Sequence, residues 1–383
     1  MEYVMLKDVC AINMGQSPDS DSYNNNGEGV PFFQGNADFG ERYPVVRKWC
    51  SAPTKMAAPE DILISVRAPI GAMNYAKEEC CIGRGLAALT PDRTKVSPEF
   101  LFWLLKEKNT ELNSKGTGST FKAIGKKVLE ETMIPNIPIE KQLEYSEALE
   151  KVHAIIQMRK KEIQHLDDLI KARFVEMFGS IHDGRFDMKT LLEIVNDDKN
   201  SIKRGPFGGA LKKEDFVEDG YLVYEQRHAI HNDFEYAKYY INQEKYEDMI
   251  GFKVIPGDLI ISCSGVTLGR IAEVPEGAKE GIINQALLKL SLNPHIMMNT
   301  FFIQQFRGEE IQNILFGFSR GSGIPNMPSM SEVKAVKFIC PPLELQKEYC
   351  DFVHQVDKSK VAVQKALDET KLLFDSLMQK YFG

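Results

Sequence analysis

The residues of this chain that could do chemistry gather in glycine-rich loops that follow predicted strands. One such loop is Ser65-Val-Arg-Ala-Pro-Ile-Gly71, and another is Ser262-Cys-Ser-Gly-Val-Thr-Leu-Gly-Arg270. Glycine lets a backbone approach a phosphate group closely, while hydroxyl and basic side chains donate hydrogen bonds to its oxygens. Arginine, glutamine and asparagine can also read base edges in the major groove. The loops therefore suit the binding of DNA, although each loop alone is also typical of an ordinary solvated turn.

The candidate DNA-binding residues form two sets, one in each half of the chain. The first set is Gln16, Ser17, Gln34, Arg67, Arg84, Lys115, Thr117, Ser119 and Lys122. The second set is Lys203, Arg204, Gln226, Arg227, Ser264, Thr267, Gln285, Arg320 and Ser322. Arg84 and Gln285 occupy matching positions at the start of a predicted strand, and their types suit guanine and adenine edges respectively.

Three motifs resemble catalytic or metal-binding signatures but lack a necessary residue. Gly118-Ser-Thr-Phe-Lys-Ala-Ile-Gly125 resembles a phosphate loop, but its glycine spacing is wrong and Lys127 stands where serine or threonine would bind magnesium. Asn293-Pro-His295 begins like the clamp of amino-methyltransferases but lacks the second proline and the aromatic residue, so we interpret it as a turn. His228 and His231 could bind a metal ion, but no third ligand follows, and a surface histidine pair is the default interpretation.

We therefore predict that the chain by itself is not an enzyme and has no catalytic residues, no bound metal and no cofactor. A methyltransferase or nuclease in one chain is the enzymatic alternative. It would need a cofactor loop together with a catalytic tetrad or a carboxylate cluster, and the sequence contains neither motif.

An internal repeat relates the two sets of loops. Four pairs of segments match in the same order: Leu6–Val9 with Leu191–Ile194, Gly29–Phe33 with Gly220–Tyr224, Pro59–Ser65 with Pro256–Ser262, and Pro138–Tyr145 with Pro342–Tyr349. The offset between the copies rises steadily from 185 to 204 residues, as expected if the second copy is longer through loop insertions. The sequence therefore predicts a tandem duplication.

Each copy ends in a segment whose apolar residues recur at alternating spacings of four and three residues. The first seam is Tyr145, Leu149, Val152, Ile156, Ile163, Leu166, Ile170 and Met177, and the second is Tyr349, Val353, Val356, Val363, Leu367, Phe374, Leu377 and Tyr381. Arg159 and Arg173 interrupt the first seam, and Lys360 and Thr370 interrupt the second. This spacing is typical of coiled-coil helices, and we expect the two to pair. A lone amphipathic helix on a globular core is the alternative for either copy.

The remaining segments predict globular domains of the mixed α/β (α+β) class with many short strands. Expected strands are Asp61–Val66, Leu86–Leu89, Asp258–Cys263 and Leu287–Leu292, and expected helices are Phe100–Lys108 and Thr300–Arg307. We divide the chain into a first globular domain (1–137), a central helix (138–180), a second globular domain (187–340) and a C-terminal helix (341–383).

The composition limits the class of protein. Hydrophobic residues make up 43% and charged residues 26%, and the net charge is −7. This excludes a simple polycation but not a DNA-binding protein whose basic residues gather on one face. No apolar run approaches the roughly 20 residues that span a bilayer, the N-terminus lacks the pattern of a signal peptide, and the seven cysteines contain no CxxC spacing. We therefore expect a cytoplasmic protein with reduced thiols.

Several of these motifs recur in both copies in the same order. They are Leu6–Val9, Gly15-Gln-Ser-Pro18, Asp61–Gly71, Gly118-Ser119, Ile134–Pro138 and Gln142 in the first copy, and Gly257–Ser262, Gly321-Ser322 and Pro341–Gln346 in the second. Together they resemble the specificity subunit of type I restriction–modification systems. The chain departs from the family pattern Pro-Pro-x-x-Glu-Gln at Ile137, Lys141 and Leu345, all at the helix starts.

The resemblance implies two target-recognition domains, each reading one half of a bipartite DNA target, joined by two long helices in an antiparallel coiled coil. It implies that the partners are double-stranded DNA, two DNA methyltransferase subunits and, in the full complex, restriction and translocase subunits. A tandem-repeat adaptor that binds proteins through the same loops, without DNA specificity, is the alternative.

Overall fold

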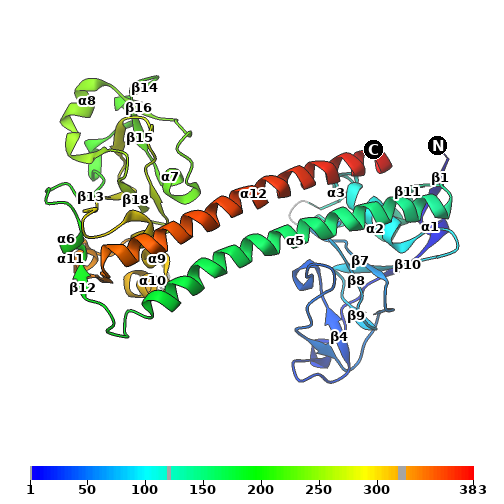
Figure 1. The fold of residues 1–383 in the computed structure, drawn as a ribbon. Helices are drawn as coiled ribbons and strands as arrows, with labels where there is room; N and C mark the ends of the chain where they lie inside the picture. Colours follow the sequence, from blue (N-terminus) through cyan, green and yellow to red (C-terminus); the bar gives the residue numbers. More distant parts are fainter. Residues whose placement is uncertain (1, 119–121, 318–324) are drawn as a thin grey trace. The chain divides into compact units, whose positions relative to one another are not determined.

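The computed structural model describes residues 2–118, 122–317 and 325–383. The chain divides into two compact units. Unit 1 is Met1–Lys161 together with Gln364–Gly383, and unit 2 is Glu162–Val363. Each unit contains part of two long helices, α5 (Ile139–Phe178) and α12 (Leu343–Phe382), which are green and orange-red in Figure 1.

Unit 1 is a mixed α/β unit with short strands. Its strands are β1 (Tyr3–Met5), β2 (Cys10–Met14), β3 (Tyr23–Asn24), β4 (Val30–Phe33), β5 (Trp49–Cys50), β6 (Met56–Ala57), β7 (Ile62–Ser65), β8 (Met73–Tyr75), β9 (Cys80–Ile82), β10 (Leu86–Pro91) and β11 (Met133–Pro135). Its short helices are α1 (Leu6–Val9), α2 (Pro98–Glu107), α3 (Asn109–Ser114) and α4 (Lys126–Glu130). The sheets have the orders β1-β11, β2-β10-β7-β8 and β3-β5-β4-β9-β6.

Unit 2 repeats this topology. Its strands are β12 (Met188–Thr190), β13 (Ile202–Arg204), β14 (Phe216–Val217), β15 (Tyr221–Tyr224), β16 (Tyr240–Ile241), β17 (Lys253–Val254), β18 (Leu259–Ser262), β19 (Ile271–Glu273), β20 (Gly281–Ile283), β21 (Leu287–Leu290) and β22 (Lys337–Ile339). Its short helices are α6 (Leu191–Ile194), α7 (Gln226–His231), α8 (Gln243–Asp248), α9 (Asn299–Arg307), α10 (Glu309–Phe316) and α11 (Met330–Ala335). The sheet orders are β12-β22, β13-β21-β18-β19 and β14-β16-β15-β20-β17.

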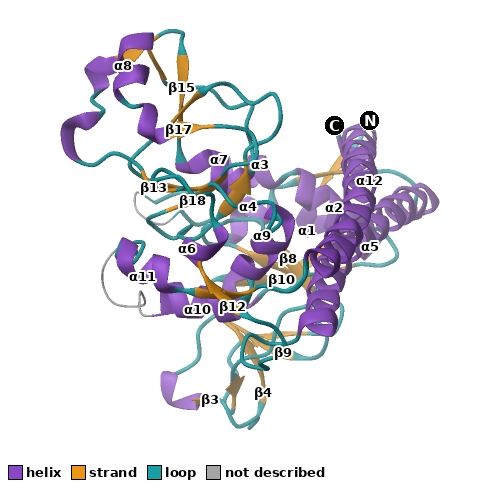
Figure 2. Ribbon diagram, turned by 60° about the vertical axis from the view of Figure 1, so that its left-hand side comes forward, coloured by secondary structure: helices purple, strands orange, loops and turns teal. Residues whose placement is uncertain are grey.

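The two units match strand for strand, which confirms the internal repeat. In each five-stranded sheet the same pair is parallel, β4 with β9 and β15 with β20, while its other paired strands are antiparallel. All four repeated sequence segments fall on equivalent elements, such as α1 with α6 and β7 with β18. Figure 2 shows how short these strands are and how much of each unit is loop.

The expected strands form where continuous apolar runs are buried on both faces. Every residue of β7 and of β18 is buried, as is typical of a strand inside a core. The expected helix near Phe100 begins at Pro98, and Ser97 caps it by accepting a hydrogen bond from the Phe100 N–H at 3.4 Å. Within the described ranges, no helix is long and apolar enough to cross a membrane.

Two buried glutamines explain the repeated motif at the start of the long helices. The Gln142 Oε1 accepts a hydrogen bond from the Ser97 N–H at 2.9 Å, and its Nε2 donates to the carbonyl of Ile137. In unit 2 the Gln346 Oε1 accepts from the Met298 N–H at 2.9 Å. Each glutamine thus fastens the start of a long helix to the start of a core helix, and this pairing of buried backbone groups explains why both copies carry glutamine there.

The apolar seams of α5 and α12 contact each other and also enter the cores of the units. In unit 1 the rings of Tyr145 and Tyr381 stack at 4.1 Å, and both pack against the core. In unit 2 the Tyr349 hydroxyl donates to the Ile170 carbonyl at 3.2 Å. Leu149 and Tyr349 are completely buried. The seam residues therefore serve both arrangements that the periodicity allows, helix pairing and packing on a globular core.

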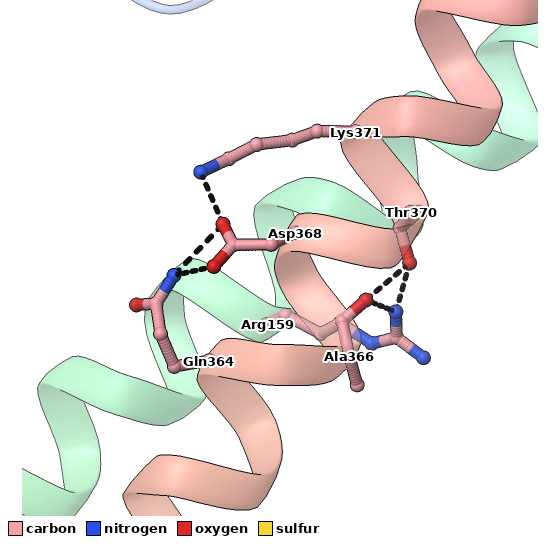
Figure 3. Close-up of polar contacts among 6 residues, drawn as sticks. All are labelled: Arg159, Gln364, Ala366, Asp368, Thr370 and Lys371. Atoms are coloured by element: carbon pink, nitrogen blue, oxygen red, sulfur yellow. Dashed lines mark hydrogen bonds and ion pairs between the residues drawn. The ribbon is translucent and has the colours of Figure 1, made fainter.

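The polar residues that interrupt the seams have partners on the other long helix. The Arg159 guanidinium donates to the Ala366 carbonyl and to the Thr370 hydroxyl, as Figure 3 shows. In unit 2 the Lys360 ammonium lies 2.5 Å from an Asp167 carboxylate oxygen.

Arg173 of α5 similarly pairs with Glu348 of α12 at 2.9 Å. Within each unit, residues with higher numbers on α5 contact residues with lower numbers on α12. The interruptions therefore form specific polar contacts between the helices.

Candidate DNA interface

In unit 1, four of the predicted residues come together at the turn between β9 and β10. The Gln34 Nε2 donates to the Ser17 hydroxyl at 2.9 Å, and the Arg84 backbone N–H donates to the same hydroxyl at 3.4 Å. The Gln16 N–H donates to the Ile82 carbonyl at 3.0 Å, which places Gln16 beside this turn. The side chains of Gln16, Gln34 and Arg84 are exposed, so hydrogen-bonding groups from three segments share one surface.

A glycine in each unit makes this arrangement possible. An added Cβ at Gly15 would lie 2.2 Å from the Gly83 carbonyl oxygen, and one at Gly205 would lie 1.8 Å from the Asn284 carbonyl oxygen. Both distances are far below van der Waals contact, so only glycine lets the end of β2 or β13 approach the turn this closely. The two glycines occupy equivalent positions, as the repeat predicts.

A second group of predicted residues in unit 1 lies on the loop after β7. The Ala68 N–H donates to the Lys122 carbonyl at 3.0 Å, and Ala123 forms backbone bridges with Arg67 and Thr117. The side chains of Arg67, Thr117 and Lys122 are exposed. The Val66 N–H donates to the Gly85 carbonyl at 2.9 Å, which joins this loop to the turn that carries Arg84.

Lys115 is held by an ion pair within its own helical segment. Its ammonium lies 2.6 Å from Glu111, which also binds Lys108 at 2.9 Å. Hydrogen bonds from Lys115 and Lys108 lower the pKa of the Glu111 carboxyl. A phosphate contact by Lys115 would therefore compete with Glu111. Ser119, also predicted here, lies outside the described residues.

Unit 2 brings four predicted residues together in the equivalent place. The Gln226 Nε2 donates to the Ser264 hydroxyl at 2.7 Å, and the Arg204 Nη2 donates to the Asn326 Oδ1 at 3.1 Å. Ser264 and Asn326 form a backbone bridge. Gln285 is exposed on the adjoining turn between β20 and β21. The matching of Arg84 with Gln285 is therefore confirmed in structural position.

Three other predicted residues of unit 2 are engaged within the unit. Arg227 lies 3.6 Å from Asp233 and stacks over the Tyr236 ring at 4.4 Å. The Lys203 ammonium lies 4.8 Å from the centre of the Phe252 ring. The Thr267 carbonyl accepts a hydrogen bond from a serine hydroxyl and so shapes its loop. Arg320 and Ser322 lie outside the described residues.

Asn326 and Phe207 lie at this surface but are absent from the predicted set. Asn326 has no sequence signal, because the equivalent bridge in unit 1 is formed by Ala123. Phe207 is 67% exposed, and its ring lies 5.1 Å from the Arg204 guanidinium carbon. Aromatic residues are usually assigned to the core from sequence, so only its exposure reveals it.

The expectation that His228 and His231 form a surface pair is wrong, because His228 is not at the surface. Its side chain is fully buried, the Nδ1 accepts a hydrogen bond from the Glu225 N–H at 2.9 Å, and the Nε2 donates to the Tyr236 carbonyl at 2.9 Å. Both ring nitrogens are therefore occupied by backbone groups, and His228 and His231 do not form a metal-binding pair. Asn293-Pro-His295 is a turn after β21, as predicted, and the Asn293 side chain accepts from the His295 N–H at 3.0 Å.

The family model described as type I restriction modification DNA specificity domain matches residues 1–167 and 206–370. The chain belongs to this family. The two matched segments correspond to the two copies of the repeat, so the chain carries two such domains in tandem.

Two relatives are similar to part of the chain. Over 156 residues the chain is 44% identical to the type I restriction enzyme MjaX specificity subunit of Methanocaldococcus jannaschii, a match that covers 41% of this chain and 37% of that protein. It is 47% identical to the HsdS subunit from Thermoanaerobacter tengcongensis over 39% of this chain and 36% of that one, with a TM-score of 0.36. The high identity is therefore confined to less than half of each relative.

A third relative shares the fold over the whole length. The S subunit of the type I restriction–modification system from M. genitalium matches 100% of this chain and 96% of its own, with a TM-score of 0.55 and 17% identity. At that identity the likeness concerns the fold alone.

Proposed function

We propose that this chain is the sequence-specific DNA-binding subunit of a type I restriction–modification complex, in which each of two recognition domains reads one half of a bipartite target. The observation that carries the proposal is the repetition of one surface. In both units, the segments around the turn before β10 or β21 and the loop after β7 or β18 bring arginine, glutamine and serine side chains together. These are the side chains that pair with base edges and phosphates.

The proposed domains are 1–137 and 187–340, with the helices of 138–180 and 341–383 as an antiparallel coiled coil that sets the spacer. The stack of Tyr145 on Tyr381 and the Arg159–Thr370 hydrogen bond in unit 1 support this arrangement, as does the Lys360–Asp167 pair in unit 2. A polar residue in an otherwise apolar seam is a common means of selecting one helix register.

The proposed partners are double-stranded DNA, two DNA methyltransferase subunits and, in the full complex, restriction and translocase subunits, all in the cytoplasm. Catalysis would belong to the partners, so the chain itself would be non-catalytic. Segment 140–179 carries eight acidic and seven basic residues. A surface with balanced charge suits protein contacts better than phosphate contacts.

Co-expression with its methyltransferase tests the proposal. The two proteins are expected to elute together in size-exclusion chromatography, and the complex should direct adenine methylation to one bipartite sequence. Methylome sequencing of cells with and without this chain measures the result. Separate elution, or methylation that is independent of this chain, would contradict the assignment.

The adaptor alternative makes the opposite prediction for DNA. A DNA-specificity subunit in its complex binds duplex DNA with an affinity that falls as salt rises, because phosphate contacts release counterions. An adaptor without DNA specificity shows no such binding. Fluorescence polarisation with a labelled duplex at two salt concentrations separates the two functions.

We expect Arg84→Ala to relax one position of one half-site. A bidentate arginine–guanine pair contributes about 1–3 kcal/mol of discrimination, so preference at that position should fall roughly 5- to 150-fold. The other half-site should be unchanged, because Arg84 lies in unit 1. Selection from a randomised duplex library measures both half-sites at once.

Arg93→Ala is the matched control for that variant. Arg93 is also an exposed arginine of unit 1, but it pairs with Glu60, away from the turn that carries Arg84. It should leave both half-sites intact. If Arg84→Ala selects the same sequences from the library as the wild type does, Arg84 is not a base-reading residue.

A further inference from the structure

Arg204 is held in one orientation at the surface of unit 2. It is the last residue of β13, and its Nη2 donates to the Asn326 Oδ1 at 3.1 Å. The Asn326 Oδ1 also accepts from the Met327 backbone N–H at 2.9 Å, which fixes the amide in place. The Phe207 ring lies 5.1 Å from the guanidinium carbon and is itself 67% exposed. One hydrogen bond and one stacking contact therefore define the plane of the guanidinium.

The charge of Arg204 is not neutralised within the protein. Among the described residues, no acidic side chain forms a salt bridge with it, and its guanidinium donates only to the neutral amide of Asn326, while its Nε is buried without a hydrogen-bond partner. Cys263 lies beside it, but burial raises the pKa of this thiol to about 12, so the thiol stays protonated. A guanidinium placed in this way keeps its charge, and its remaining Nη donors rather than the buried Nε are the groups that could bind a ligand.

The equivalent surface of unit 1 carries a guanidinium that comes from a different segment. Strand register places Met14 of β2 at the position of Arg204, since Met14 faces Ala87 and Arg204 faces Leu288. In unit 1 the arginine is Arg67, whose backbone bridges to Ala123, whereas in unit 2 Ser264 forms that bridge with Asn326. Both units thus place one arginine beside the same backbone bridge, by two unrelated sequence positions.

We propose that Arg204 reads a guanine in the half-site bound by unit 2, and that Asn326 and Phe207 are positioning residues that orient its guanidinium. This inference rests on the proposed function. Guanine offers the acceptor pair O6 and N7 in the major groove, and the planar fork of arginine matches that pair in a bidentate contact. The fork must be presented in a fixed plane, and the amide of Asn326 and the ring of Phe207 supply that constraint.

The surrounding side chains agree with a base contact rather than a phosphate contact alone. Gln226 and Ser264 form a hydrogen-bonded pair beside Asn326, and Gln285 is exposed on the adjoining turn. Amide and hydroxyl groups next to an arginine provide the mixture of donors and acceptors that distinguishes base edges. A site for phosphate alone requires only donors.

The test uses the full chain in complex with its methyltransferase and selection from a duplex library that is randomised over both half-sites. Arg204→Lys keeps the charge but removes the fork. We expect a loss of guanine preference at one position of one half-site, about 5- to 150-fold, with the other half-site unchanged. Phe207→Leu and Asn326→Ala should each weaken preference at that same position, and Phe207→Tyr should restore it by keeping the ring.

Arg67→Lys and Arg185→Lys are the matched controls. Arg67→Lys should affect only the opposite half-site, and Arg185→Lys, in the segment before β12, should affect neither. Thermal unfolding of every variant shows whether the fold is kept. If Arg204→Lys does not fold, the Phe207 and Asn326 variants decide the question by the same position-specific measure.

The outcomes separate this inference from the proposed function. If the wild-type complex selects a bipartite sequence and Arg204→Lys selects the same sequence with equal stringency, Arg204 is not a base reader and the proposed function stands. A uniform loss over all positions of the half-site also overturns the inference, because it indicates a phosphate contact. If the wild-type complex selects no sequence, the proposed function itself fails.

Discussion

Removing one heptad from each long helix, residues 157–163 of α5 and 364–370 of α12, is expected to shorten the DNA spacer by about three base pairs. Seven helical residues span roughly 10 Å at about 1.5 Å per residue. One base pair of B-DNA rises about 3.4 Å. If the coiled coil sets the separation of the recognition domains, as we propose, the half-site sequences should persist while their separation contracts. Affinity for the original site should then fall by two orders of magnitude or more, because only one half-site fits.

These two heptads are chosen because the structure pairs them. Arg159 is removed together with Ala366 and Thr370, the residues to which it donates hydrogen bonds. No half-buried guanidinium is left without a partner, and a deletion of seven residues keeps both seams in phase. The variant should therefore fold, which circular dichroism and thermal unfolding will show.

A deletion in one helix alone is the control for the spacer experiment. Deleting 157–163 alone leaves Thr370 without Arg159 and makes the helices unequal, so assembly with the methyltransferase should be impaired. Methylome sequencing of the paired deletion reads the new spacer directly. Methylation of the original sequence with its original spacer would show that the helices do not set the gap, and the coiled-coil strut would have to be abandoned.

The substitution Gly205→Ala should abolish recognition of the half-site bound by unit 2. An added Cβ would lie 1.8 Å from the Asn284 carbonyl oxygen and 2.5 Å from its carbonyl carbon. Because both atoms belong to the backbone, either β13 or the turn that carries Gln285 must move. Both of them carry proposed base contacts, Arg204 and Gln285. Binding to the bipartite site is expected to fall at least 100-fold, and the free energy of unfolding of unit 2 by about 1–3 kcal/mol.

Equivalent and neutral glycines provide the controls. Gly15→Ala should have the mirrored effect on the other half-site, since its Cβ would lie 2.2 Å from the Gly83 carbonyl oxygen. Gly125→Ala should change neither, because no heavy atom lies within 4 Å of its added Cβ and its φ is −91°. Chemical denaturation and library selection measure the two effects. If Gly205→Ala selects the same sequences as the wild type, the close approach of Gly205 to the Asn284 carbonyl is not needed for the proposed DNA recognition.

The sequence alone determined the repeat and most of the elements that build it. The matched segments around Pro59 and Pro256 predict β7 and β18, since continuous apolar runs after a proline are typical of buried strands. The paired prolines near 138 and 342 predict the starts of α5 and α12. These features depend on local spacing and on burial, and both leave a periodic signal in one segment. The equivalence of Arg84 and Gln285 in the two copies follows from the same alignment of the chain with itself.

The tertiary structure decided which side chains meet. Arg204 and Asn326 are 122 residues apart, and the hydrogen bond between them depends on where the segment after 324 crosses β13. Arg159 was recognisable as an interruption of a seam, but its partner Thr370 follows only from the register of two helices. His228 became a buried structural residue because backbone groups of Glu225 and Tyr236 converge on its ring. Contacts between distant segments arise from packing, which the spacing within one segment does not encode. From sequence, the proposed base-reading surface could therefore be located only to its loops.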